Sequence, residues 1–204
     1  MNANSARDDL AFMRALVAAG ADSQKTFGEI YAAGGLCYGT QMLLHGGQAL
    51  GLLSTSAAPS LVIGFGPTVV FLAILAWILG RQTPQVPSAV NRAIGAVFGA
   101  VGLANLAMVV IIGSVAWRLH SITVWLIYPC VVMVLQGMAW LVAFMLRRRS
   151  WMGVVALGWF LVGIGMAVAI QTIGAYIVVA GIGMVAFMLI PGLMMIRQAR
   201  QAGG

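Results

Sequence analysis

Carboxylate side chains are scarce in this sequence and absent from most of it. The four acidic residues are Asp8, Asp9, Asp22 and Glu29. No Asp or Glu lies between Ile30 and Gly204. Membrane pumps and ion-coupled transporters use intramembrane carboxylates as proton or ion sites. The sequence therefore disfavours strong coupling to protons or sodium, and it leaves Glu29 as the one acid beside an apolar segment.

Recognisable catalytic and metal-binding motifs are also missing. The two cysteines, Cys37 and Cys130, lie inside apolar runs and form no CxxC pair, so each is expected to be a small buried hydrophobic residue. The chain has no HExxH zinc motif, no phosphate-binding P-loop and no dinucleotide-binding glycine pattern. We expect neither an enzyme nor a cofactor. The first apolar run starts late, so no cleavable signal peptide is expected either.

Hydrophobic residues dominate what is present. They make up 62% of the chain, and charged residues only 7%, whereas about a quarter of an average soluble domain is charged. The net charge of +7 would suggest nucleic acid as the partner of a soluble protein. Here the cations stand singly or in threes between long apolar runs, which is typical of membrane topology. The expected partner is therefore the lipid bilayer, with no nucleic acid.

Arginine divides the chain into uncharged blocks at 30–80, 93–117, 119–146 and 150–196. A membrane span needs about 20 residues, so the middle two blocks are single spans and the outer two are hairpins. Turns are expected at 54–59 and at 171–174, where polar residues interrupt the apolar runs. The sequence thus predicts an all-α polytopic transmembrane helix bundle. Its six spans are expected at about 27–52, 61–80, 93–116, 122–146, 152–170 and 175–196.

The N-terminal region, 1–26, is predicted to be a separate cytoplasmic segment. Over 5–19 it has the pattern of a short amphipathic interfacial helix, with Gly20 as its stop. The apolar face of this helix comprises Leu10, Met13, Leu16 and Val17. Two placements stay open: the helix lies in the membrane interface, or it packs on the cytoplasmic end of the bundle. The membrane domain then covers 27–196, and 197–204 form a cytoplasmic tail.

The distribution of cations predicts the orientation. Of the 11 Lys and Arg residues, ten fall in segments that share one side: Arg7, Arg14, Lys25, Arg81, Arg92, Arg147, Arg148, Arg149, Arg197 and Arg200. Only Arg118 falls on the other side. Cytoplasmic loops carry the excess of Lys and Arg, so we expect a multi-pass protein of the bacterial inner membrane with both termini in the cytoplasm.

The first predicted span is the most polar, and its polar side chains share one face. They are Tyr31, Tyr38, Gln41, His45 and Gln48, and helical geometry places them within an arc of roughly 100°. Because polar groups in lipid must find partners, this polar stripe should face the bundle interior. It either lines a binding cavity or bonds to neighbouring helices as packing.

Small residues form a second stripe beside the first, at Gly28, Gly35, Gly39 and Gly46. GxxxG pairs also occur at 47–51 and 95–99. Small residues let helices approach closely, so close packing is expected, with association of two copies as the alternative.

Further polar residues in the spans have two interpretations each. Gln41, Asn105 and Gln136 are at depths that allow one network across three helices, either as structural bonding or as part of a ligand site. His45 and His120 fall on the same outer side. Either they bind haem or a metal together, or His45 is hydrogen-bonded within the bundle and His120 is solvated at the interface.

Glu29, an interfacial acid, is either a proton-binding residue or a partner of Arg81, Arg92 or the basic loop Arg147–Arg149. The absence of recognisable chemistry favours a non-enzymatic accessory, sensor or scaffold protein. It would act through partners that dock on the N-terminal helix and on this basic loop, and the partner is another membrane protein or a second copy. The alternative is a small transporter or channel for a neutral or lipophilic molecule. A haem- or metal-binding membrane protein ranks last.

The orientation is testable with topology reporters. Fusions after Gln85, after Arg149 and at Gly204 should report the cytoplasm, whereas fusions near Ala57, His120 and Thr172 should report the outer side. The reason is the ten-to-one distribution of cations. An outer signal at Arg149 would overturn the whole topology.

Overall fold

The computed structural model describes residues 3–82 and 88–202, and side chains for 23–82 and 88–201. Within these ranges every regular element is helical. The elements are α1 (Ala3–Ala49), α2 (Ala57–Gly80), α3 (Ala89–Leu119), α4 (Ile122–Arg147), α5 (Ser150–Val168), α6 (Ile173–Met184), the π-helix η1 (Val185–Leu189) and α7 (Ile190–Ala202). Because α6, η1 and α7 follow one another without a gap, they form one rod, and the described chain has six rods.

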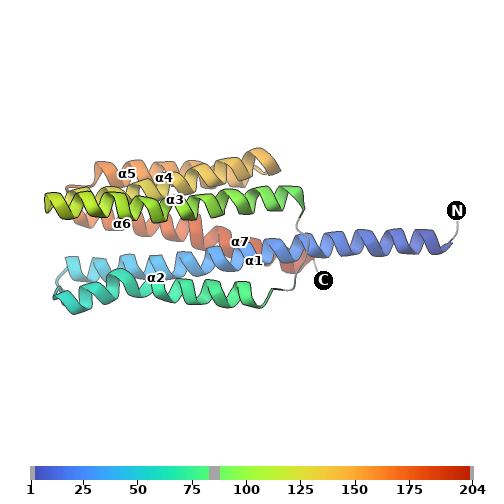
Figure 1. The fold of residues 1–204 in the computed structure, drawn as a ribbon, viewed down its shortest axis with the longest axis horizontal. Coiled ribbons are helices and arrows are strands. Elements are labelled where there is room, and N and C mark those ends of the chain that lie inside the picture. The colour runs from blue at the N-terminus through green and yellow to red at the C-terminus, as the bar shows by residue number, and fades with distance from the viewer. Residues whose placement is uncertain (1–2, 83–87, 203–204) are drawn as a thin grey trace.

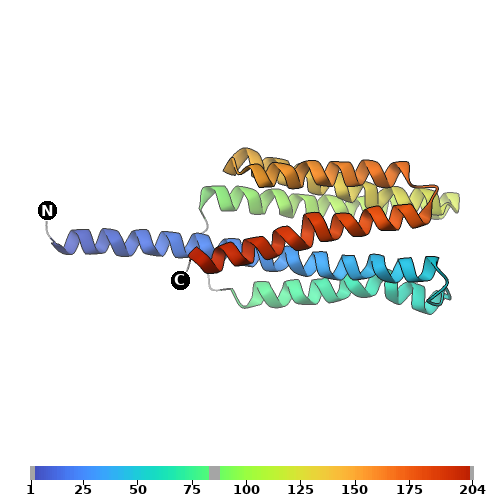
Figure 2. The same ribbon diagram turned by 180° about the vertical axis from the view of Figure 1, so that it is seen from behind.

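The rods lie lengthwise beside one another (Figures 1 and 2). α2 packs on α1, α1 packs on the rod of α6, η1 and α7, and α6 packs on α5. α5, α4 and α3 then follow in order. The first and last segments of the chain are therefore neighbours in the middle of the bundle, and α2 and α3 lie at its margins.

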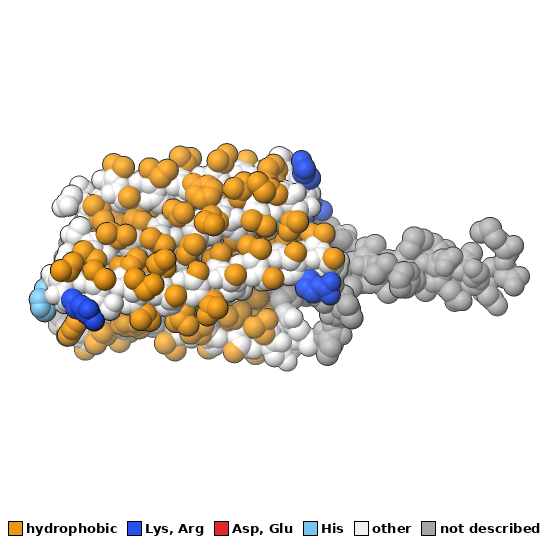
Figure 3. All heavy atoms as spheres, turned by 45° about the horizontal axis from the view of Figure 1, so that its top comes forward, with side chains coloured by type: hydrophobic (Ala, Val, Ile, Leu, Met, Phe, Trp, Pro, Cys, Tyr) orange, Lys and Arg blue, Asp and Glu red, His pale blue; other side chains and the backbone are white. Residues whose placement is uncertain are grey.

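Five of the rods are long and apolar enough to cross a membrane: α2, α3, α4, α5 and the rod Ile173–Gln201. Large hydrophobic side chains such as Val69, Leu103 and Leu161 are exposed on their outer faces. Figure 3 shows hydrophobic side chains along the whole visible length of the bundle, with blue cations at its two ends. A surface of this kind is stable in lipid and not in water, so the chain is a membrane protein.

α1 differs from the expectation at its N-terminal end. It is one continuous helix of 47 residues that runs through Gly20, and Figure 1 shows its N-terminal part projecting beyond the other rods. The predicted stop at Gly20 was wrong, because α1 continues through this residue. Glycine inside a helix costs only about 0.5–1 kcal/mol, and the surrounding alanines, the best helix formers, offset this cost.

Short turns set the antiparallel order of α3, α4 and α5. Two residues, His120 and Ser121, connect α3 to α4, and two more, Arg148 and Arg149, connect α4 to α5. His120 and Arg148 adopt positive φ values of 48° and 55°, which ends each preceding helix in the left-handed conformation. The Ser121 hydroxyl accepts a hydrogen bond from the Val124 N–H at 3.3 Å and caps α4.

The predicted hairpin turns lie where the polar residues indicated them. α1 ends at Ala49 and α2 begins at Ala57, so Pro59 stands in the first turn of α2, where its missing N–H is tolerated. α5 ends at Val168 and α6 begins at Ile173.

A close helix contact joins α1 to the C-terminal rod, and it uses the predicted small-residue stripe. A Cβ atom added at Gly35 would lie 2.5 Å from the Leu189 nitrogen, and one added at Gly28 would lie 2.9 Å from the Gly192 oxygen. Conversely, a Cβ at Gly192 would lie 2.5 Å from the Ala32 nitrogen. The backbones therefore touch, as small residues permit.

A π-helical turn lies at the same contact. The Ile190 N–H bonds to the Val185 oxygen, five residues earlier. Pro191 follows at once, and a proline inside a helix removes a donor and crowds the carbonyl four residues before it, here Phe187. The wider π turn accommodates that crowding without ending the helix.

The glycine contact predicts a contrast between two Gly→Ala substitutions. Gly35→Ala should lower the free energy of unfolding by about 1–3 kcal/mol, because the new methyl group overlaps backbone atoms of Leu189. Gly99→Ala should be neutral or slightly stabilising, because nothing lies within 4 Å of its Cβ position. Thermal unfolding of both variants in the same detergent measures the difference. Equal effects at the two positions would contradict the packing described.

Candidate functional site

Tyr31 is the centre of the largest polar contact inside the bundle. Its hydroxyl accepts hydrogen bonds from the indole N–H of Trp140 at 2.5 Å and of Trp159 at 3.0 Å. It donates to the Gln136 side-chain oxygen at 3.4 Å. The side chains of Tyr31, Trp140 and Trp159 are all buried, with 3% or less of their surface exposed. One hydroxyl of α1 thus joins α4 and α5.

Aromatic rings surround this hydroxyl. Phe27 stacks on Tyr31 with ring centroids 5.7 Å apart, and Trp140 meets Tyr31 edge-on at 5.2 Å. Phe98 of α3 contacts both Phe27 and Trp140, at 4.7 and 5.8 Å. The rings exclude lipid and water from the polar group, which strengthens its hydrogen bonds and makes their loss costly.

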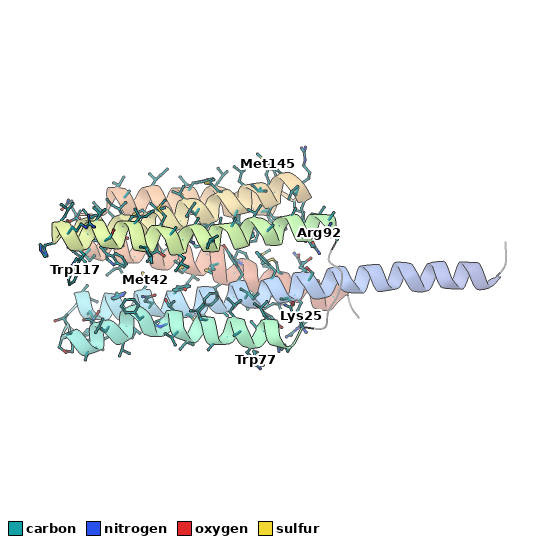
Figure 4. All side chains as sticks on the ribbon, viewed as in Figure 1. Lys25, Met42, Trp77, Arg92, Trp117 and Met145 are labelled. Carbon is teal, nitrogen blue, oxygen red and sulfur yellow. The ribbon has the colours of Figure 1, made fainter. Side chains whose placement is uncertain are left out.

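Sequence reasoning missed Trp140 and Trp159. The signal was their depth: both stand well inside a span, whereas Trp and Tyr gather at the membrane surfaces. A buried indole usually needs a partner for its N–H. Trp77 and Trp117, by contrast, lie near opposite ends of the bundle (Figure 4).

Gln41 hydrogen-bonds to a different helix from Tyr31. Its amide N–H donates to the Gly64 carbonyl of α2 at 2.9 Å. Pro67 follows within α2, and an internal proline disturbs the hydrogen bonds of the preceding turn. Pro67 has no N–H to donate to the Ile63 carbonyl, and the Gly64 carbonyl that Gln41 binds is the next one in the same turn. Gln41 thus joins α1 to the turn of α2 that precedes Pro67.

Gln48 and His45 hold the other end of the same helix pair. The Gln48 amide donates to the Ser54 carbonyl at 2.8 Å and to the Ser60 hydroxyl at 3.1 Å. The His45 Nδ1 atom lies 3.1 Å from the Gln48 side-chain oxygen. Tyr38 lies between these groups and Tyr31 and is half-buried. Its ring packs against the ring of Phe71, with the two ring centroids 5.6 Å apart.

Glu29 forms an ion pair at the end of the bundle from which α1 projects. Its carboxylate lies 2.5 Å from the Arg81 guanidinium, which also stands 4.0 Å above the Trp77 ring. Glu29 therefore joins α1 to the end of α2, using one of the partners that the sequence offered. Both side chains are partly exposed, so the pair is worth about 0–1 kcal/mol.

The three mid-membrane amides do not meet in one network. Gln41 bonds to α2, Gln136 accepts from Tyr31, and the Asn105 side-chain oxygen is buried without a hydrogen-bond partner in the described structure. The sequence interpretation grouped these residues because they lie at similar depths in the membrane. In the structure their side chains point in different directions around their helices. A buried amide oxygen without a partner is uncommon and costly.

The remaining sequence candidates are His120 and the basic loop. His120 is exposed at the end of α3, and its backbone forms the α3–α4 turn. Within the part of the chain that the structure describes, no three His, Cys, Asp or Glu side chains gather as a metal site. The basic loop comprises a half-buried Arg147, which donates to the Asn91 side-chain oxygen, and the exposed Arg148 and Arg149.

Four of the five stripe residues thus hydrogen-bond to atoms of this chain, and the partners come from α2, α4, α5, the α1–α2 loop and, for His45, α1 itself. This arrangement favours packing over a solvent-filled cavity. Comparison of the chain with protein-family models, with curated proteins and with solved structures finds no match.

The Tyr31 contact predicts a large effect from the loss of one atom. Tyr31→Phe should lower the free energy of unfolding by about 1–3 kcal/mol, because it leaves two buried indole N–H groups and one amide unpaired. It should also change the tryptophan emission, since Trp140 and Trp159 lose their acceptor. Unfolding in detergent followed by fluorescence measures both.

Tyr128→Phe is the matched control. The Tyr128 ring stacks on Trp125 at 5.5 Å, and the described structure gives its hydroxyl no hydrogen bond. A loss of stability at position 128 as large as that at position 31 would show that the effect is not specific to the buried contact.

Proposed function

We propose that this chain is a non-enzymatic integral membrane protein that acts through a protein partner, and that the projecting part of α1 binds this partner. The observation that carries the proposal is the continuous 47-residue helix. At about 1.5 Å per residue it is roughly 70 Å long, more than twice the hydrocarbon thickness of about 30 Å. Figure 2 shows the N-terminal part of α1 beside no other rod.

The proposed topology has six spans in a bacterial inner membrane, with both termini in the cytoplasm. α1 lies alongside α2 and the C-terminal rod, and hydrogen bonds satisfy four of its five stripe residues, so this segment can cross with its neighbours. Lys25, Arg92 and Trp77 lie near the end from which α1 projects (Figure 4). The cation excess at that end supports a cytoplasmic position.

A small transporter for a neutral or lipophilic molecule is the second candidate, and Asn105 favours it. Its buried oxygen without a partner offers an acceptor at mid-depth of α3. The bonded state of Gln41, His45 and Gln48 supports the first candidate instead, because side chains that bond to the protein are not free to receive a substrate.

The partner proposal is testable on the apolar face of the projecting segment. Leu10→Glu combined with Leu16→Glu should reduce partner co-purification at least tenfold, because two charges interrupt the face that would pack on a partner. Ala15→Glu with Ala18→Glu is the control, since helical geometry puts these positions off that face. Both double variants should keep the yield and unfolding temperature of the parent, because Figure 1 shows this segment outside the bundle.

A photo-reactive residue at position 10 or 16, but not at 15, should give a cross-linked product of defined mass. A product twice the mass of the chain would identify a second copy as the partner. Recovery of a lone protein from several mild detergents, without cross-links at 10 or 16, would refute the proposal.

A further inference from the structure

The α4–α5 turn concentrates three positive charges in and beside a connection of only two residues. Arg147 is the last residue of α4, Arg148 has φ 55° and ψ 26°, and Arg149 precedes the first residue of α5. The side chains of Arg148 and Arg149 are exposed. Because both flanking helices are long and apolar enough to span a membrane, a two-residue turn keeps these charges at the membrane surface.

No carboxylate of the bundle is available to neutralise the charges of these three arginines. The sequence has no Asp or Glu after Glu29, and Glu29 is paired with Arg81 at 2.5 Å. Arg147 donates to a neutral partner, the Asn91 amide. Three neighbouring cations that repel one another therefore lack a counter-charge from the membrane domain itself.

The equivalent turn at the other end of α4 shows what is unusual here. In the α3–α4 turn the residue before the helix is Ser121, whose hydroxyl accepts the Val124 N–H. In the α4–α5 turn that position holds Arg149, which gives no side-chain cap and has no acceptor atom in its side chain. The turn thus offers donors and positive charge, and it lacks an acceptor.

We propose that this turn binds the phosphate of an anionic phospholipid headgroup, through the guanidinium groups of Arg148 and Arg149. Planar guanidinium groups pair with phosphate oxygens through two parallel hydrogen bonds. Lipid phosphates lie at the depth at which membrane-spanning helices end, so charge and depth both match this occupant. The proposal is independent of the partner of α1 and of the orientation of the chain.

The test measures thermal unfolding of the full chain by the fluorescence of its 6 tryptophans. Nanodiscs of phosphatidylcholine are compared with nanodiscs that contain phosphatidylglycerol. The anionic lipid should raise the unfolding temperature by about 4–8 °C. The shift should shrink strongly at high salt, since exposed charges are screened.

Matched variants locate the effect. Arg148→Gln with Arg149→Gln should remove more than half of the lipid-dependent shift. The first control is Arg197→Gln with Arg200→Gln, which removes two exposed cations of α7. The second control is Arg118→Gln near the end of α3. Both controls should keep most of the lipid-dependent shift. Arg148→Gly tests the site without risk to the fold: glycine suits the positive φ, so stability in phosphatidylcholine should stay or rise while the shift falls.

Three results would overturn the proposal. The first is an equal unfolding temperature in the two lipids. The second is an equal loss of the shift in the α7 variant, which would mean an unspecific charge effect. The third is a full shift from inorganic phosphate in phosphatidylcholine nanodiscs, which would mean a site for a soluble anion rather than for a lipid.

Discussion

The hydroxyl of Tyr31 has to be satisfied by protein, because hydrocarbon offers it no hydrogen-bond partner. An unpaired polar group there costs several kcal/mol, and the described structure meets this demand with two indoles and an amide from α4 and α5. The requirement fixes the depth and the rotation of α1 relative to both helices. The rings of Phe27 and Phe98 fill the remaining space, so a single polar atom organises the aromatic core.

The neighbouring face of α1, beside the polar stripe, depends on the absence of side chains. Where Tyr31 faces large aromatic residues, Gly28 and Gly35 face the backbone of η1 and α7. The helix therefore carries two interfaces of different character, one polar and aromatic and one of direct backbone contact. Its position in the middle of the bundle, between α2 and the C-terminal rod, follows from this division.

Much of the helix order could be predicted because charges and turn residues mark the ends of apolar runs. Arg81, Arg92 and the three arginines at 147–149 delimit α2, α3, α4 and α5 closely. The continuation of α1 through Gly20 could not be predicted in this way, because the local signal of one glycine is smaller than the summed helix preference of its alanine neighbours.

The candidate site was predictable in one respect and not in another. Periodicity identified the face of α1 that carries Tyr31, Gln41 and Gln48, but it cannot tell which helix lies opposite that face. Trp140 and Trp159, and the separation of Asn105 from Gln41, depend on the rotation of each helix about its axis. That rotation is set by packing, which a single sequence does not display.

The separation of contacts along the chain bears on how the protein is made. Gln48 and Gln41 find partners 12 and 23 residues later, so the first hairpin can satisfy them as soon as α2 emerges. Tyr31 must wait for Trp140 and Trp159, 109 and 128 residues further on. At a synthesis rate of about 5–20 residues per second, its hydroxyl enters the membrane roughly 5–25 s before its partners exist. During that interval the nascent hairpin needs water, lipid headgroups or an insertion factor to shelter one exposed hydroxyl.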